Sequence, residues 1–273
     1  GLTLLEGRNG AKIDQKEAAN CFEKAASDGN VDGMVNYGKC FLFGTGVQKD
    51  DQKAFKYFKE AALASNEFRQ MNSPTKNYFN EINTDLESST TSSDDDDDTE
   101  SPVLMASSSP ARITIDNNKE HESLAEGICY YAFCLLKKRG LPQDEEVDTE
   151  NIMKYFKLAA KMGNVEAMVQ YGTHCIEQTD GPAFLKVAAN SGNPEAQFYF
   201  SNYLKEKNPT FSSKYLKQAA ENRSYSPFFP PDEDEIITVK KSAGYFEPAV
   251  EMWGKLLYEN IDENADAAIH YFK

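Results

Sequence analysis

A short helical segment that ends in two alanines recurs along the chain and constrains the fold more than any other feature. An aromatic residue or leucine stands three positions before each alanine pair, in Phe22–Ala26, Phe58–Ala62, Phe156–Ala160, Leu185–Ala189 and Leu216–Ala220. Self-similarity with a period of about 20 to 50 residues is typical of stacked helical repeats. Successive alanine pairs lie 36, 98, 29 and 31 residues apart, so the second interval contains a large insertion.

A second motif follows these segments and completes the repeat unit. Gly33–Gly38 matches Ala167–Gly172, and Gly127–Ala132 and Ala249–Gly254 fit the same frame. Each unit is therefore interpreted as two short amphipathic helices, which cannot bury their apolar faces without neighbouring units. Small residues at recurring positions indicate closely packed backbones, since glycine inside a helix costs about 1 kcal/mol relative to alanine. The predicted packing positions are Gly38, Gly44, Gly46, Ala61, Ala62, Ala159, Ala160, Gly172, Ala188, Ala189 and Gly254.

Glycines also follow three of the alanine pairs by three residues, each immediately before an asparagine. These are Gly29, Gly163 and Gly192. A helix often ends at a residue in the left-handed conformation, which glycine adopts without strain. We therefore expect a helix to end at each of them.

One segment, Gly44 to Ala62, resembles the Sel1-like repeat, a relative of the tetratricopeptide repeat. The pattern G-x-G-V-x-x-D-x-x-x-A-x-x-Y-F-x-x-A-A is carried by Gly44, Gly46, Val47, Asp50, Ala54, Tyr57, Phe58, Ala61 and Ala62. The third and fourth repeats lack the G-x-G-V turn, which explains their shorter spacing. The resemblance implies an all-α, right-handed superhelical solenoid of antiparallel helix pairs, with about five repeats.

The composition divides the chain into five parts. Residues 1–65 hold the first repeat and the first helix of the second, and residues 120–222 hold the following repeats. Between them, residues 66–119 form a Ser- and Asp-rich acidic insertion that we expect to be disordered. Residues 223–235 form a loop of prolines and acidic residues, in which Phe228 and Phe229 are interpreted either as packing back on the solenoid or as contacting a partner. Residues 236–273 form a truncated C-terminal repeat. The insertion is interpreted either as a solvated loop or as a regulatory segment, with Ser92 and Ser93 before the acidic run Asp94–Asp98 as phosphorylation candidates.

Charge and cysteine content restrict the class of protein. A net charge of −15 argues against binding to nucleic acid or to an anionic membrane surface. The chain has no run of about 18 apolar residues that would cross a membrane. An odd set of cysteines (Cys21, Cys40, Cys129, Cys134 and Cys175) disfavours a disulfide framework. A cytoplasmic location is expected, with association with the endoplasmic reticulum as an alternative. A secreted repeat protein would instead form a Cys21–Cys40 bridge.

No catalytic set is recognisable in the sequence. His121, His174 and His270 are scattered and have no paired nucleophile or metal-ligand cluster. Gly44–Gly46 follows a predicted helix and no Gly-Lys-Ser/Thr ends it, which excludes a phosphate-binding loop. We therefore expect a protein that is not an enzyme and needs no cofactor or metal.

Lysines recur in register with the alanine pairs. Lys59, Lys157, Lys186 and Lys217 stand two residues before an alanine pair, and Lys56, Lys154 and Lys214 lie three residues upstream of three of them. One interpretation is a solubilising set on an exposed face. The other is a row of cations that binds an acidic peptide, for which the Asp94–Asp98 run could compete within the same chain.

The resemblance implies a role in protein–protein interaction. We expect an adaptor or scaffold that binds a peptide or protein partner on the concave face of the solenoid. The alternative is the regulatory repeat region of a larger enzyme, such as a protein kinase. Composition fixes neither the partner nor the oligomeric state.

Overall fold

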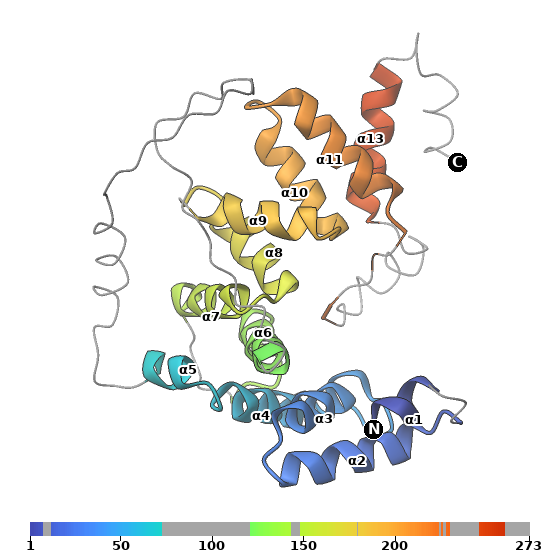
Figure 1. Ribbon diagram of the computed structural model, residues 1–273, viewed down its shortest axis with the longest axis vertical. Helices are drawn as coiled ribbons and strands as arrows, with labels where there is room; N and C mark the ends of the chain where they lie inside the picture. Colours follow the sequence, from blue (N-terminus) through green and yellow to red (C-terminus); the bar gives the residue numbers. More distant parts are fainter. Residues whose placement is uncertain are drawn as a thin grey trace, which may run out of the picture.

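A computed structural model describes residues 1–7, 12–72, 121–142, 148–178, 180–223, 225, 228–229 and 246–259. The described residues contain helices and no strand (Figure 1). The N-terminal helices are α1 (Leu2–Glu6), α2 (Gln15–Ser27), α3 (Val31–Phe43), α4 (Asp51–Ala62) and α5 (Asn66–Met71). The remaining ones are α6 (Glu122–Leu136), α7 (Thr149–Lys161), α8 (Val165–His174), α9 (Gly181–Asn190), α10 (Pro194–Leu204), α11 (Pro209–Glu221) and α13 (Glu247–Glu259).

The described helices form five antiparallel pairs, α2–α3, α4–α6, α7–α8, α9–α10 and α11–α13, and each pair packs on the next. In Figure 1 the pairs follow one another along the long axis of the molecule, from the blue N-terminal helices to the red α13. The long insertion does not break the stack, since α4 packs directly against α6. The expected all-helical solenoid of about five repeats is confirmed.

Local sequence signals set the ends of the helices. Asp or Asn side chains cap the first turns, as when Asn30 accepts a hydrogen bond from the backbone N–H of Gly33. Gly29, Gly163 and Gly192 adopt φ values of 80°, 91° and 91° just after α2, α7 and α9. The predicted left-handed helix ends are therefore confirmed at all three glycines.

Small residues lie where helix backbones meet. The alanine pairs that end α4, α7 and α9 are buried, with Ala61, Ala62, Ala159, Ala160 and Ala188 fully inaccessible and Ala189 nearly so. A Cβ on Gly38 would lie 2.7 Å from the ring of Phe58, and one on Gly172 would lie 2.9 Å from the Cβ of Leu185. Gly254 is buried in α13. Gly38 and Gly172 therefore leave no room for a larger side chain.

The segment after α4 differs from the sequence-based boundary. We expected the insertion to begin at residue 66, but Asn66–Met71 form helix α5, whose N–H groups are capped by Ser65. Phe68 is 1% exposed and its ring lies 5.1 Å from Tyr155 and 5.4 Å from Tyr131. Burial of this one aromatic side chain holds α5 on the solenoid. Residues 73–119 of the predicted insertion lie outside the described residues.

Two long turns pack back onto helices that start earlier in the chain. Gly46, after α3, has φ 73°, and a Cβ there would lie 2.0 Å from the carbonyl oxygen of Gln15 at the start of α2. Gly140, after α6, has φ 71° and stands in the same relation to Asp51 at the start of α4. Only glycine fits either position. The connections α8–α9 (residues 175–180) and α10–α11 (residues 205–208) are shorter.

Candidate functional site

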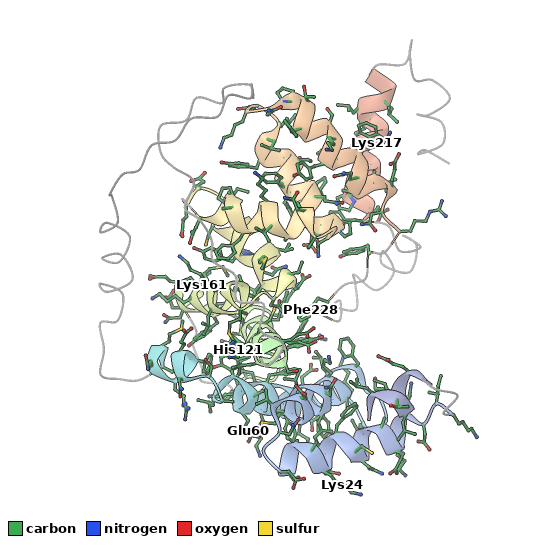
Figure 2. The ribbon with its side chains drawn as sticks, in the orientation of Figure 1. Lys24, Glu60, His121, Lys161, Lys217 and Phe228 are labelled. Atoms are coloured by element: carbon green, nitrogen blue, oxygen red, sulfur yellow. The ribbon has the colours of Figure 1, made fainter. Side chains whose placement is uncertain are left out.

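The seven lysines in register do not share one environment. Lys56 and Lys59 lie on α4, Lys154 and Lys157 on α7, Lys186 on α9, and Lys214 and Lys217 on α11. Lys56 pairs with Glu60 at 3.9 Å, and Lys217, labelled in Figure 2, pairs with Glu221 at 3.8 Å. Both are pairs one helical turn apart on an exposed surface, which contribute little to stability.

Lys157 makes an ion pair between two elements of the fold. Its Nζ atom lies 2.6 Å from Oδ2 of Asp180 and 5.3 Å from the centre of the Tyr171 ring. Tyr171 donates a hydrogen bond of 2.9 Å to Oδ1 of the same carboxylate. Burial opposes ionisation of Asp180, but the hydrogen bonds from Lys157 and Tyr171 outweigh it and hold its pKa below the usual value. Lys157 therefore joins α7 to the α8–α9 turn.

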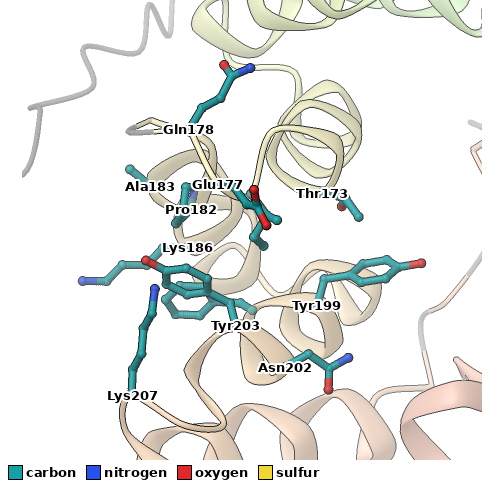
Figure 3. Close-up of a pocket in the computed structure, with 12 residues that line it drawn as sticks. Thr173, Glu177, Gln178, Pro182, Ala183, Lys186, Tyr199, Asn202, Tyr203 and Lys207 are labelled. Carbon is teal, nitrogen blue, oxygen red and sulfur yellow. The ribbon is translucent and has the colours of Figure 1, made fainter.

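Lys186 lies in a groove formed by α8, α9, α10 and the turns that follow α8 and α10. The groove has a volume of about 830 Å³ and is open to solvent (Figure 3). It is lined by Thr173, Ile176, Glu177, Gln178, Pro182, Ala183, Lys186, Tyr199, Phe200, Asn202, Tyr203 and Lys207. Tyr203 stacks on the buried Phe200 with ring centres 6.0 Å apart, and the Lys207 Nζ atom lies 3.6 Å from the centre of the Tyr203 ring. The groove thus combines an aromatic floor with two lysines.

The groove occupies the position that a long glycine turn fills in the N-terminal repeats. In those units the glycine turn after α6 covers the start of α4, and the turn after α3 covers the start of α2. The equivalent turn after α10 is short, and Pro182 and Ala183 at the start of α9 line the groove instead. Sequence reasoning missed Tyr199, Tyr203 and Lys207. The signal that could have located them was the 29- and 31-residue spacing without a G-x-G-V turn.

A second aromatic surface lies on α6. The Phe228 ring stacks on Tyr130 with centres 4.3 Å apart, and the Phe229 ring stacks on Phe133 at 5.3 Å. Figure 2 places Phe228 beside α6, although it follows α11 in the chain. The sequence singled out this phenylalanine pair in the predicted loop 223–235; residues 230–235 lie outside the described part of the chain.

Glutamates recur in the same repeat register on three stacked helices, Glu126 on α6, Glu166 on α8 and Glu195 on α10. Glu126 forms an ion pair of 2.8 Å with Lys39 on α3. Among the described residues, no lysine or arginine pairs with Glu166 or Glu195. Burial, followed by the charge of Glu195, raises the pKa of Glu166 to about 8, and burial raises that of Glu195 to about 7. Both shifts favour the protonated form of these two carboxyl groups.

The described residues hold no group of three or more His, Cys, Asp or Glu side chains that could bind a metal ion. His121 stands at the start of α6 and His174 ends α8, while His270 lies outside the described residues. All five cysteines are free, and no Cys21–Cys40 bridge is formed. Burial raises the pKa of the Cys40 thiol to about 11 and that of Cys134 to about 12, which disfavours reactive thiolates at both positions. No helix of the described part is long and apolar enough to cross a membrane.

Comparisons with known proteins agree with this architecture. The Sel1 repeat model matches residues 1–30, 31–66 and 125–164, and the last two matches begin near α3 and α6 and end near the close of α4 and α7. The crystal structure of a Sel1 repeat protein from Oxalobacter formigenes is similar in fold, with a TM-score of 0.58 and 12% sequence identity. That similarity covers 99% of this chain and 80% of the other.

A protective antigen of uropathogenic Escherichia coli that displays an SLR fold was also found. Its TM-score is 0.45 and its identity 16%, covering 95% of this chain and 48% of that one. The search of curated proteins gave no match. The chain therefore contains Sel1 repeats in residues 1–66 and 125–164, and the helix pairs that follow continue the same stack.

Proposed function

We propose that this chain is a non-enzymatic interaction scaffold or adaptor that binds a peptide segment of a protein partner in the groove between α8, α9 and α10. Proteins built from Sel1 repeats generally mediate protein–protein interactions. The single observation that carries the proposal is the open groove of about 830 Å³ with an aromatic floor. The proposed site therefore involves three helices, whereas the sequence led us to expect binding on the concave face of the solenoid as a whole.

The lining supports a peptide that is acidic and carries one apolar or aromatic anchor. Tyr199, Phe200 and Tyr203 offer rigid aromatic surface, which is the kind of contact that concentrates binding energy at protein interfaces. Lys186 and Lys207 lie on the same side of the groove as Tyr203 (Figure 3), where a carboxylate of the peptide would meet both cations. Glu177 on the lining would disfavour a peptide with uniform negative charge.

The test begins with a displayed library of random peptides of about twelve residues, selected on the whole chain. We expect the enriched peptides to contain acidic residues beside an aromatic or aliphatic one. Their affinities are then measured for Lys186→Glu/Lys207→Glu, with Tyr203→Ala as a second groove variant. Each should lose about tenfold or more in affinity, since anchor contacts dominate such interfaces.

The matched control is Lys214→Glu/Lys217→Glu on α11, which makes the same change in charge at two exposed lysines outside the groove lining. It should bind the selected peptides as the wild-type chain does. Equal losses in both double variants would mean a general charge effect and would reject the groove as the site. Circular dichroism on every variant confirms that the fold is retained.

A further inference from the structure

The phenylalanine pair after α11 makes contacts that are typical of a bound peptide. Phe229 is buried and Phe228 is half-buried, and both stack nearly parallel on aromatic rings of α6, with interplanar angles of 22° for Phe228 on Tyr130 and 13° for Phe229 on Phe133. The hydroxyl of Tyr130 also donates a hydrogen bond of 3.4 Å to the backbone carbonyl of Phe228. Main-chain and side-chain contacts are therefore made together.

The surface on α6 that contacts the phenylalanine pair is supported by side chains of α4 and α7. Tyr130 also stacks on Phe58 of α4, with ring centres 4.7 Å apart. Phe133 contacts Phe156 of α7 edge-on, with ring centres 5.2 Å apart. Both supporting phenylalanines are fully buried. At the C-terminal end of this surface, the Arg139 guanidinium lies 5.5 Å from the centre of the Phe229 ring. The contacts with Phe58 and Phe156 hold the rings of Tyr130 and Phe133 in fixed orientations, so the surface is preorganised for binding.

The segment that fills this surface resembles a short linear motif in its sequence. Its residues read Tyr225-Ser226-Pro227-Phe228-Phe229-Pro230-Pro231, followed by Asp232–Glu235. Proline-rich segments with an aromatic anchor are suited to docking on aromatic surfaces because they lose little conformational entropy. The sequence between the two partners of the contact is long, since Tyr130 and Phe228 are 98 residues apart.

We propose that the Tyr130–Phe133 surface of α6 is a peptide-binding site that the chain's own Phe228–Phe229 segment occupies, and that a partner peptide with two adjacent aromatic residues displaces this segment. We expect two adjacent aromatic residues in the partner peptide because the Phe228–Phe229 segment makes its contacts through two aromatic rings. A tethered segment competes at an effective concentration in the millimolar range, so only a partner that binds well exchanges with it. The contact thus acts as an internal block on one site of the scaffold. This inference does not depend on the groove between α8 and α10.

The probe for the test is a labelled synthetic peptide of residues 225–235. It is titrated into the wild-type chain and into Phe228→Ala/Phe229→Ala, in which the surface is vacated. Fluorescence anisotropy should show binding to the vacated chain that is about tenfold or more tighter than to the wild type, because the tethered competitor is removed. A peptide with alanine at both phenylalanine positions should bind neither chain.

A conservative variant locates the binding surface. Tyr130→Phe in the vacated chain keeps the ring but loses the hydrogen bond to the Phe228 carbonyl, and should weaken the peptide by about threefold. Equal affinity for the wild-type and vacated chains would overturn the proposal, as would no binding to a vacated chain that circular dichroism shows to be folded. A wild-type dimer that the peptide dissociates would assign the surface to a second copy and would also overturn it.

Discussion

The N-terminal helix pairs and those from α8 onward differ mainly in how their helices are connected. In the first region, the glycine turns after α3 and α6 reach back and cover the starts of α2 and α4. In the second region, the connection after α10 is short, and Pro182 and Ala183 in the first turn of α9 line a groove. In the same helix pairing, the start of the first helix is therefore either covered by a turn, which we call a closed edge, or lines a groove, which we call an open edge. A few connecting residues make the difference. The groove thus lies where the repeat departs from its pattern.

The largest expected effect is on the closed edge. Gly46→Ala forces φ 73° on a residue with a Cβ and places that Cβ 2.0 Å from the Gln15 carbonyl oxygen, so the turn must leave α2. We expect the free energy of unfolding, measured by urea titration, to fall by about 3 kcal/mol. Gly140→Ala should behave alike, since it meets the Asp51 carbonyl at the same distance.

Gly29→Ala is the control for backbone strain alone. Its φ is 80°, but a Cβ there has no atom within 4 Å. The loss should be about 1 kcal/mol, the usual cost of a left-handed residue that is not glycine. Similar losses for Gly29→Ala and Gly46→Ala would show that the long turns do not close the edge by packing.

The second effect concerns the glutamate row. Glu126 pairs with Lys39 of the preceding repeat. The residue equivalent to Lys39 is Phe133 in the repeat before Glu166 and Thr173 in the repeat before Glu195, and neither carries a charge. Because the pKa of Glu166 in the folded state is about 8 and its unfolded value is about 4.3, the folded chain binds the extra proton between these values. Stability should therefore fall as the pH rises from about 4.5 to 8.

Glu166→Gln should remove that fall, because the amide keeps an oxygen for the hydrogen bond from Gln170 and carries no charge. We expect it to exceed the wild type by about 1 to 2 kcal/mol in free energy of unfolding at pH 8 and to match it near pH 4.5. Glu126→Gln is the matched control and should destabilise at pH 8, since it breaks the ion pair with Lys39. If both variants shift stability in the same direction at pH 8, the missing cation does not explain the difference.

The sequence predicted the architecture because repeated packing residues act locally. Alanine pairs, helix-ending glycines and capping asparagines recur at fixed spacing, and each one determines its own turn or contact. The site was harder to predict, since the groove depends on a turn that is absent and on rings such as Tyr203 that also suit a core. Phe68 was missed as part of the solenoid because its aromatic partners, Tyr131 and Tyr155, lie far away in the sequence. For the Phe228–Phe229 pair, packing on the solenoid was one of two expectations, but the sequence did not indicate α6 as the surface.

The smallest expected effect is a difference in free energy of unfolding between variants of two lysines in the predicted row, Lys157 and Lys217. Lys157→Met removes the ion pair with Asp180 at 2.6 Å and leaves a carboxylate with only Tyr171 as a side-chain donor, and should cost about 1 kcal/mol at pH 7. Lys217→Met removes an exposed pair with Glu221 at 3.8 Å and should change the free energy of unfolding by less than about 0.5 kcal/mol.

The pH dependence of the same variants identifies the cause. The pKa of Asp180 is below its usual value, so its stabilising contribution is present above the unfolded pKa and is lost as the pH falls through the folded pKa. Lys157→Met should therefore differ from the wild type at pH 7 and approach it in acid, whereas the small difference for Lys217→Met should stay flat. A constant deficit for Lys157→Met down to acidic pH would mean that the contact of the ammonium group with the Tyr171 ring, and not the ion pair, carries the effect. In that case the lysine row is a packing feature, and only Lys186, in the groove, retains a role in binding.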